Sequence, residues 1–262
     1  MKKRIEFVQE ELKKRGLFHG DIDGKVGGGT VAGLNQVPGI DKTWEIRRKI
    51  IGFIQVHCRL NGFSPGDIDG YWGPDTEHAF KQYMDNRNTG QPTRLWRPED
   101  RTPVNPNLWP AQYTPQFDSF YGEKGSSLVN VQLPYPHRLS WEQTTVINSF
   151  QCHQKVHDSL KRVLTNVLNH YGIKRIRELK LDLWGGCYNE RPIRGGIRWS
   201  MHSWGIAVDY DPGRNKLEWG RDKAAFARPD YDKWWEYWEA EGWVSLGRER
   251  NFDWMHVQAA KL

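Results

Sequence analysis

Cysteine and long apolar runs are both scarce in this sequence. Only three of the 262 residues are cysteines, and Cys58, Cys152 and Cys187 are far apart. An odd, scattered set excludes a disulfide framework and fits folding in a reducing compartment such as the cytoplasm. No run of apolar residues approaches the length needed to cross a bilayer. We therefore expect no stable insertion into a membrane.

A secretory signal and a concentrated basic region are also missing. The basic start Met1–Arg4 is followed by charged residues where a signal peptide has its apolar core. Lysine and arginine number 38 against 32 aspartates and glutamates, and this formal net charge of +6 attracts polyanions. No basic run lies on a single expected helix, and no nucleic-acid module is recognisable. We therefore do not expect nucleic acid as a partner.

The first part of the chain contains an internal repeat. Gly16–Gly24 aligns with Gly62–Gly70 at an offset of 46 residues, and the same offset pairs Gln9 with Gln55. Such self-similarity indicates a duplicated structural unit. Each copy predicts an amphipathic helix, a glycine-rich turn and a second short helix. The two copies are expected to pack together, because one helical hairpin has too small a core.

The repeated pattern G-x-x-x-G-x-I-D-G-x-x-G-x-x-T resembles the helical peptidoglycan-binding modules attached to many wall hydrolases. This resemblance implies a small all-α peptidoglycan-binding domain over residues 1–86. A helical repeat used only for packing is the alternative. The run Asp21–Gly24 also invites a calcium-loop interpretation, but the later ligands of such a loop are missing. A turn shaped by glycine is therefore favoured over a metal site.

Residues 87–116 are rich in proline and tryptophan and connect the repeat to the rest of the chain. They hold six of the 14 prolines, which disfavours regular helix or central strand. Trp96, Trp109 and Tyr113 distinguish this stretch from a disordered linker, which is poor in aromatic residues. We predict an extended connection that lies against a domain.

From residue 117 onward the pattern changes to mixed helix and strand, which predicts an α+β domain over residues 117–262. A helix is expected over Ser149–Asn169, where apolar residues recur along one stripe. Strands are expected over Leu179–Leu183, Ile206–Asp209 and Trp254–Ala259.

Two motifs near the ends of these predicted strands, S-M-H-S-W-G-I-A-V-D and D-W-M-H, carry the chemistry. Together they supply two imidazoles and two carboxylates. A catalytic zinc ion prefers such donors in a tetrahedral shell and keeps one position open for water. His202, Asp209 and His256 could supply three ligands, which leaves Asp253 as a base.

The pattern S-x-H-x-x-G-x-A-x-D followed by D-x-x-H resembles a family of zinc peptidases. The family includes D-Ala-D-Ala carboxypeptidases, the vancomycin-resistance dipeptidases and phage L-alanyl-D-glutamate endopeptidases. The resemblance implies an α+β zinc peptidase domain in which His202, Asp209 and His256 bind zinc and Asp253 is the general base. The final motif carries Gln258 where several relatives carry glutamate.

Residues 185–196 also resemble the approach to the active site in that family. An arginine there is expected to stabilise the oxyanion of the transition state. Arg191 is the first candidate and Arg194 the second, while a surface arginine paired with a carboxylate is the structural alternative. Tyr188, Arg194 and Ser200 are expected to contact the substrate.

A rival metal site could be built from Cys152, His153 and His157, since histidines four apart share a helix face. No glutamate follows His153 in the H-E-x-x-H manner, so a packing role is favoured for these residues. Cys187 lies close to the main motifs, but no partner at a known spacing marks it as a nucleophile.

The sequence therefore predicts a monomeric peptidoglycan hydrolase of the phage endolysin type that uses zinc-activated water. Its substrate bond lies in a peptide stem or cross-link, and both L-Ala-D-Glu endopeptidase and D-Ala carboxypeptidase or endopeptidase activities remain open. Without a signal peptide, the enzyme would stay in the host cytoplasm and reach the wall, in the periplasm, after the membrane is permeabilised. The alternative is a non-catalytic peptidoglycan-binding protein with a degenerate peptidase domain.

Overall fold

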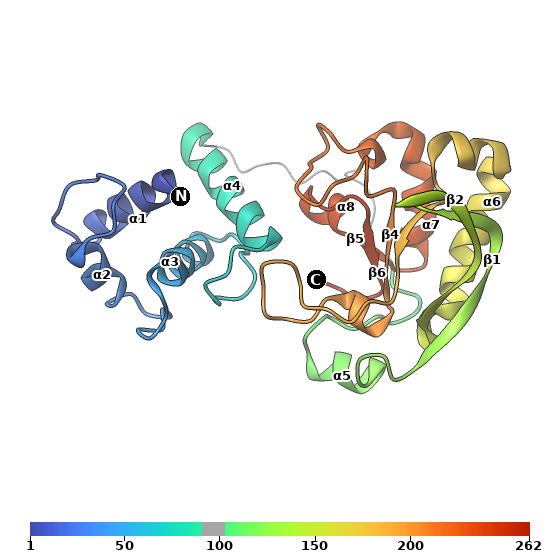
Figure 1. Ribbon diagram of the computed structural model, residues 1–262, viewed down its shortest axis with the longest axis horizontal. Helices are drawn as coiled ribbons and strands as arrows, with labels where there is room; N and C mark the ends of the chain where they lie inside the picture. Colours follow the sequence, from blue (N-terminus) through green and yellow to red (C-terminus); the bar gives the residue numbers. More distant parts are fainter. Residues whose placement is uncertain (91–102) are drawn as a thin grey trace. The chain divides into compact units, whose positions relative to one another are not determined.

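The computed structural model describes residues 1–90 and 103–262. These residues form two compact units, one built from residues 1–90 and 193–197 and the other from residues 103–192 and 198–262. Among the described residues up to 121, the named elements are helices, and a mixed six-stranded sheet with further helices follows (Figure 1). The expected α+β class is confirmed at this level.

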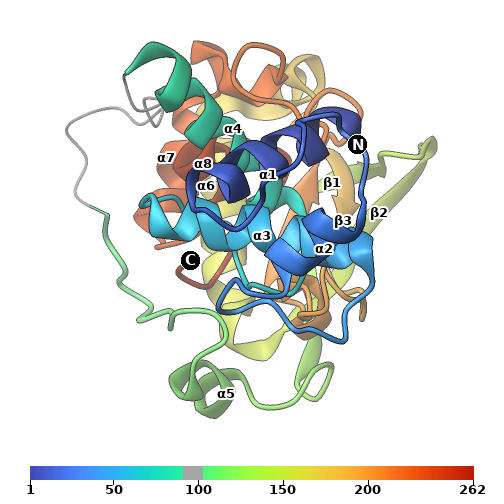
Figure 2. The same ribbon diagram turned by 90° about the vertical axis from the view of Figure 1, so that its left-hand side faces the viewer.

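The first unit consists of helices around a small apolar core (Figure 1 and Figure 2). Each copy of the repeat contributes a helix, a turn and a second helix, in the predicted order, but the second helix is short only in the first copy: it has 7 residues there and 16 in the second copy. Val8 and Leu12 from the first copy are buried, as are Ile50 and Ile54 from the second. The helices are α1 (Lys2–Lys14), α2 (Gly28–Leu34), α3 (Ile46–Leu60) and α4 (Pro74–Thr89).

A buried glutamine closes the turn in the first copy. The Gln9 amide donates from Nε2 to Asp23 Oδ1 and to the carbonyl of Lys25, both at 2.9 Å, and to Thr30 Oγ1 at 3.4 Å. Its Oε1 accepts from the backbone N–H of Gly24 at 2.9 Å. Gly24 adopts φ +68°, which a residue with a Cβ rarely does. The carboxylate of Asp23 therefore belongs to a turn, as the sequence indicated.

The second copy repeats this network at the same offset of 46 residues. The Gln55 amide donates to Asp69 Oδ1 at 2.9 Å and to the carbonyl of Tyr71 and Thr76 Oγ1, both at 3.0 Å. Its Oε1 accepts from the backbone N–H of Gly70 at 2.8 Å. Equivalent residues thus make equivalent hydrogen bonds, which supports an internal duplication.

The predicted connection is described only in part, since residues 91–102, with Trp96, lie outside the described residues. Within the described part, Trp109 is buried in the core of the second unit and donates from Nε1 to the carbonyl of Glu241 at 3.0 Å. Ala111 forms a parallel β-bridge with Lys261. Residues 109–112 therefore belong structurally to the second unit.

The sheet of the second unit has the strand order β2-β1-β3-β4-β6-β5. Strands β1 and β3 are parallel, and every other neighbouring pair is antiparallel. The strands are β1 (Leu128–Leu139), β2 (Glu142–His153), β3 (Leu183–Gly186), β4 (Ala207–Tyr210), β5 (Val244–Ser245) and β6 (His256–Gln258). Strands β4 and β6 are neighbours inside the sheet. Each has a strand on both sides, so the backbone that carries their side chains is fixed by hydrogen bonds in both directions.

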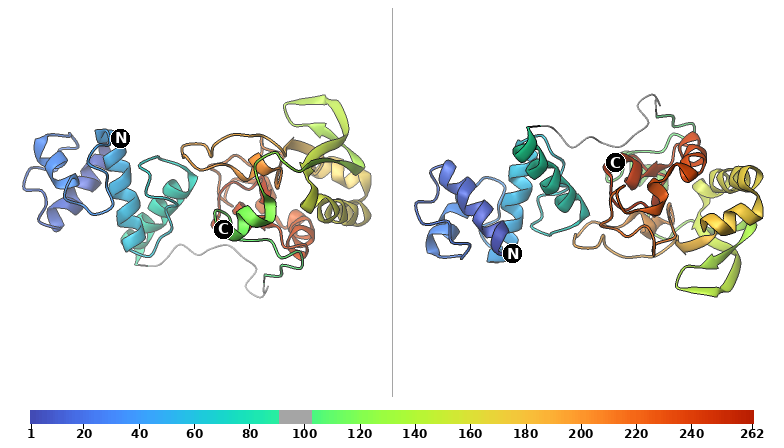
Figure 3. Two further views of the ribbon diagram at one scale, coloured as in Figure 1. Left: turned by 90° about the horizontal axis from the view of Figure 1, so that it is seen from below. Right: turned by 90° about the horizontal axis from the view of Figure 1, so that it is seen from above.

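The helices of the second unit cover this sheet. In Figure 1 and Figure 3, helix α6 runs beside the long hairpin of β1 and β2. Tryptophans from α7 and its flanks fill much of the core, among them Trp234, Trp235 and Trp243. The helices are α5 (Pro115–Tyr121), α6 (His157–Leu179), α7 (Asp232–Ala240) and α8 (Leu246–Arg250), with 3-10 turns η1 (Gln154–Val156), η2 (Met201–Trp204), η3 (Ala225–Ala227) and η4 (Pro229–Tyr231).

Several predicted boundaries differ from the structure. The helix expected over Ser149–Asn169 is wrong in its first turn, because residues 149–153 end strand β2 and helix α6 begins at His157. Its apolar stripe is nevertheless buried as expected. The strand expected over Leu179–Leu183 is wrong, because Leu179 still belongs to α6 and β3 begins at Leu183. The last two predicted strands are confirmed, with β6 shorter than expected.

No helix in the part of the chain that the structure describes is both long enough and apolar enough to traverse a bilayer.

Candidate metal centre

The two strands β4 and β6 bring Asp209 and His256 directly opposite each other. They form an antiparallel pair in the register of the sheet. His202 lies in η2, the short turn that precedes β4. Ser200 begins this turn, since its Oγ accepts from the backbone N–H of His202 at 3.4 Å. Gly205 ends it with φ +68°, so the chain reverses sharply between His202 and the strand that carries Asp209.

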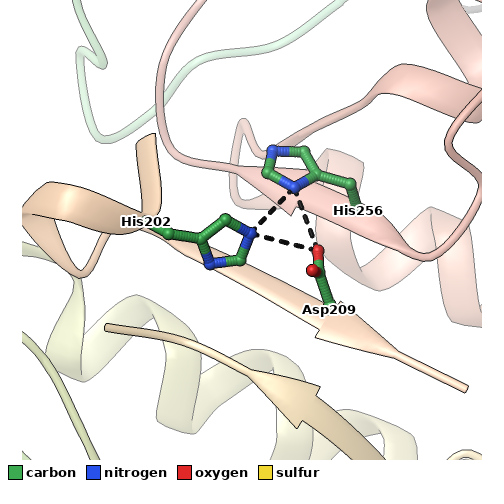
Figure 4. Close-up of side chains that lie close together, drawn as sticks. All are labelled: His202, Asp209 and His256. Atoms are coloured by element: carbon green, nitrogen blue, oxygen red, sulfur yellow. Dashed lines mark hydrogen bonds and ion pairs between the residues drawn. The ribbon is translucent and has the colours of Figure 1, made fainter. Parts of the chain in front are cut away.

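The side chains of His202, Asp209 and His256 converge on one point (Figure 4). His202 Nε2 lies 3.2 Å from Asp209 Oδ1 and 3.2 Å from His256 Nδ1. His256 Nδ1 lies 3.0 Å from Asp209 Oδ1. Both histidines are buried. The three atoms thus form a nearly equilateral triangle of possible metal donors.

The outer side of His202 determines which of its nitrogens carries a proton. His202 Nδ1 lies 2.7 Å from the backbone carbonyl oxygen of Cys187. A carbonyl oxygen only accepts hydrogen bonds, so Nδ1 must be the donor. In the neutral ring Nε2 then presents its lone pair to Asp209 and His256. Metal-binding histidines are commonly oriented in this manner by an outer carbonyl or carboxylate.

Asp209 supplies the negative charge of the cluster. Burial by itself raises the pKa of the Asp209 carboxyl, but positive charge and N–H donors on the His202 and His256 rings, when these are protonated, more than offset this and hold that pKa well below its ordinary value. Asp209 is therefore an anion at neutral pH. Two imidazoles and one carboxylate match the donor types of catalytic zinc sites.

The size of the triangle also fits a metal ion. A tetrahedral zinc ion with bonds of about 2.0–2.1 Å separates its ligand atoms by about 3.3 Å. The observed separations of 3.0–3.2 Å are close to this value. The structure therefore contains a His-Asp-His cluster able to hold a metal ion.

Asp253 lies in the turn that leads into β6, three residues before His256. It is buried and adopts φ +54°, a backbone conformation that is uncommon outside glycine. Its N–H donates to the carbonyl of Leu217 at 2.9 Å, and its carbonyl accepts from the N–H of His256 at 3.1 Å. The turn thus fixes the backbone of Asp253 with respect to a member of the cluster.

The residues expected to contact the substrate follow β3 in the chain. The backbone of Arg191 is held by Ser200 and Ser203, and its Nη1 donates to the carbonyl of Pro192 at 3.4 Å. Tyr188 is half-buried and donates to Glu190 Oε2 at 3.4 Å. Arg194 is exposed. Ser200 caps the η2 turn, and the substrate contacts of Tyr188, Arg194 and Ser200 stay predictions, as does the oxyanion role of Arg191.

The rival group of Cys152, His153 and His157 has a structural explanation. The His153 ring uses both nitrogens, with Nε2 at 3.0 Å from the carbonyl oxygen of Tyr121 and Nδ1 accepting from the N–H of Lys155 at 3.1 Å. Burial raises the pKa of the Cys152 thiol to about 12. The Nδ1 atom of His157 lies 2.7 Å from Asp158 Oδ1. These contacts favour the packing role expected from the sequence.

Two glutamines beside the cluster were not identified from the sequence. Gln258 Oε1 lies 3.2 Å from His256 Nε2, and Gln258 Nε2 donates to Gln112 Oε1 at 3.1 Å. The sequence showed that residue 258 is a glutamine where relatives of the resembling family carry glutamate. It did not show that this glutamine contacts His256. Gln112 gave no signal, because its contact spans 146 residues of sequence.

Comparison of the chain with models of known protein families, with curated proteins and with solved structures gave no match in any of the three.

Proposed function

We propose that the chain is a zinc-dependent peptidoglycan peptidase of the endolysin type. The second unit would hydrolyse a peptide bond in the stem or cross-link of the wall, and the first would hold the wall. One observation carries the proposal: His202, Asp209 and His256 converge with donor atoms 3.0–3.2 Å apart. The two sequence motifs that contain these residues resemble those of zinc peptidases, which supports hydrolysis over a purely structural metal.

The reaction would divide between the metal and the chain's own residues. Zinc, when bound, would act as a Lewis acid toward the substrate carbonyl and a water molecule. Asp253 would accept a proton from water and later protonate the leaving amine. Arg191 would donate hydrogen bonds to the oxygen that gains negative charge in the transition state. Its present bond to the carbonyl of Pro192 is long and easily exchanged.

The first unit would concentrate the enzyme on its insoluble substrate. The repeated pattern that resembles peptidoglycan-binding modules supports this role, together with the hydrogen-bond network shared by both copies. Holding the wall raises the effective concentration of scissile bonds around the second unit. We further propose that the enzyme is held in the host cytoplasm and meets the wall only after the membrane is permeabilised.

The decisive experiment combines metal analysis with digestion of purified peptidoglycan. The full chain should contain one zinc ion, and mass spectrometry of the products should show one newly formed pair of stem-peptide ends. His157→Ala provides a matched control, since it removes a histidine that lies outside the cluster. A chain that binds the wall and zinc but releases no fragments would favour the non-catalytic alternative. A chain that binds no metal would contradict the proposal.

The role of the first unit can be tested by removing residues 1–86. The two units have separate apolar cores, so the second is expected to fold without the first. Cleavage of a small soluble stem peptide should stay nearly constant, whereas release of fragments from whole wall should fall. Equal losses on both substrates would show that the repeats support the catalytic fold instead.

A further inference from the structure

The outer nitrogen of His256 faces a buried glutamine. His256 presents Nδ1 to Asp209 and His202, while its Nε2 lies 3.2 Å from Gln258 Oε1. His256 is 6% exposed and Gln258 only 2%, so bulk water does not compete for this contact. Which nitrogen of the His256 ring carries the proton therefore depends on whether Gln258 presents a hydrogen-bond donor or an acceptor to Nε2.

The amide of Gln258 can offer only an acceptor to His256. Its Nε2 donates to the backbone carbonyl of Ala260 at 3.0 Å and to Gln112 Oε1 at 3.1 Å. The amide group has two N–H donors, and these two acceptors use both. Turning the amide over would place its oxygen against the carbonyl oxygen of Ala260, which is repulsive. The hydrogen-bond partners thus fix Oε1 toward His256.

This orientation makes His256 Nε2 the donor. In the neutral imidazole only one nitrogen carries a proton, so Nδ1 keeps a lone pair. The lone pair points at Asp209 Oδ1, which is 3.0 Å away and is itself an acceptor. With both rings neutral, two acceptors at this distance repel each other unless a cation lies between them. The arrangement therefore favours a metal ion over a simple hydrogen bond.

Gln112 is held in place by the end of the chain. Its backbone N–H donates to the carbonyl of Lys261 at 2.9 Å, and the N–H of Lys261 donates to the carbonyl of Pro110 at 2.9 Å. The adjacent Ala111 forms a β-bridge with Lys261. The segment before the sheet is thus attached next to β6, and this brings Gln112 to the amide of Gln258.

We infer that Gln112 and Gln258 form a positioning pair that keeps His256 protonated on Nε2 and so presents Nδ1 to the metal. Neither glutamine contacts the three donor atoms that face the metal, so both act through His256. The inference rests on the proposed metal site, but the tautomer of His256 can be measured without metal. Removing an outer partner of a metal-bound histidine typically weakens metal binding about 10–100-fold.

The test uses Gln258→Met in the full chain, because methionine keeps the length of the side chain but loses the strong acceptor. Zinc affinity, measured by competition with a chromogenic chelator, should fall about 10–100-fold. Nitrogen-15 NMR of the zinc-free protein should show His256 protonated on Nε2 in the parent chain and a mixture of tautomers in the variant. Gln258→Glu keeps an acceptor toward His256, so His256 should stay protonated on Nε2 in this variant even though the second carboxylate oxygen then faces the carbonyl of Ala260. Gln116→Met, at an exposed glutamine, should change neither measurement.

Gln112→Met removes the far end of the pair and should give a smaller loss of affinity in the same direction. It also serves if Gln258→Met fails to fold. Parental zinc affinity and an unchanged tautomer in both folded variants would overturn the inference while leaving the metal site intact. A parent chain that binds no zinc would instead overturn the proposed function, and the tautomer measurement would then decide the positioning pair by itself.

Discussion

The two units bury polar side chains in opposite ways. In the first unit, the Gln9 and Gln55 amides each donate to acceptors and accept from a glycine N–H. In the second unit, His202 and Asp209 direct acceptor atoms at the same point as His256 Nδ1. Donors and acceptors balance in the first cluster, whereas the second brings three acceptor atoms together when both of its rings are neutral.

This difference separates a cluster that is complete in itself from one that could hold a metal ion. Buried polar groups are almost always satisfied, because leaving one without a partner costs free energy. A balanced cluster needs nothing more and serves to fix a turn. A cluster composed of acceptors is stable only with a cation, so its composition indicates a ligand. The same reasoning assigns the Gln9 and Gln55 networks to the turns of the repeats and makes the His-Asp-His cluster a candidate metal site.

The largest expected effect is the loss of zinc on removing one side chain of the His-Asp-His cluster. His202→Ala, Asp209→Ala and His256→Ala should each abolish stable zinc binding, because three protein ligands leave no redundancy. Metal analysis of the purified variants measures this directly. A variant that retains one zinc ion per chain would exclude that residue from the metal shell.

The next effect separates proton transfer from metal binding. Asp253→Asn keeps the size of the side chain but removes its ability to accept a proton, and general-base catalysis is worth about 10²–10⁴ in rate. The variant should therefore keep its zinc and lose turnover on peptidoglycan by this factor. Loss of the metal would reassign Asp253 as a ligand, and parental turnover would refute the proposed mechanism.

Disturbing the Gln9 or Gln55 hydrogen-bond network of the first unit should change the stability of the fold and leave zinc binding unchanged. Gln55→Met leaves the Gly70 N–H and the buried Thr76 without their shared partner, which should cost roughly 1–3 kcal/mol of unfolding free energy. Gln9→Met should do the same in the first copy, since the network is equivalent. Thermal unfolding measures the loss, and zinc content provides the internal control. A change in zinc content would link the two clusters in a way that their separate cores do not predict.

The smallest effect concerns pH and the first unit. Burial lowers the pKa of His57 to about 4, and Arg15 donates to its Nδ1 at 2.8 Å. The folded state thus favours the neutral ring, so the stability that His57 contributes is complete above its unfolded pKa near 6.5 and is lost as the pH falls toward 4. About 1 kcal/mol should disappear between pH 7 and pH 5.5. Calorimetry at both values should show the loss in the parent chain and a smaller loss in His57→Phe.

The local parts of this structure could be predicted from the sequence. The repeat offset identified two copies, and the structure gives Gln9 and Gln55 the same partners. The spacing within S-x-H-x-x-G-x-A-x-D fits a turn followed by a strand, which is where His202 and Asp209 lie. Such features depend on residues that are close in sequence, so the spacing of residues in the sequence can predict them.

Features that depend on the pairing of strands were missed. The hairpin of β1 and β2 was not predicted, because Pro134 and Pro136 interrupt β1 and its register shifts between Gln132 and His137. The start of α6 was placed too early, because residues 149–153 suit a helix by periodicity but pair with β1 instead. Tertiary pairing overrides local preference at both places.

The separation of Gln112 from Gln258 also bears on the order in which the molecule folds. The turn network of each repeat joins residues 15 apart, whereas the two glutamines are 146 apart. Contacts between distant residues require the entropy of a long loop to be overcome, so they form more slowly than local ones. The repeats can therefore complete their turns while the sheet is still assembling. A chain whose β4 and β6 have not yet paired does not bring Asp209 opposite His256, so an early folding intermediate would lack the candidate metal centre and, with it, the proposed activity.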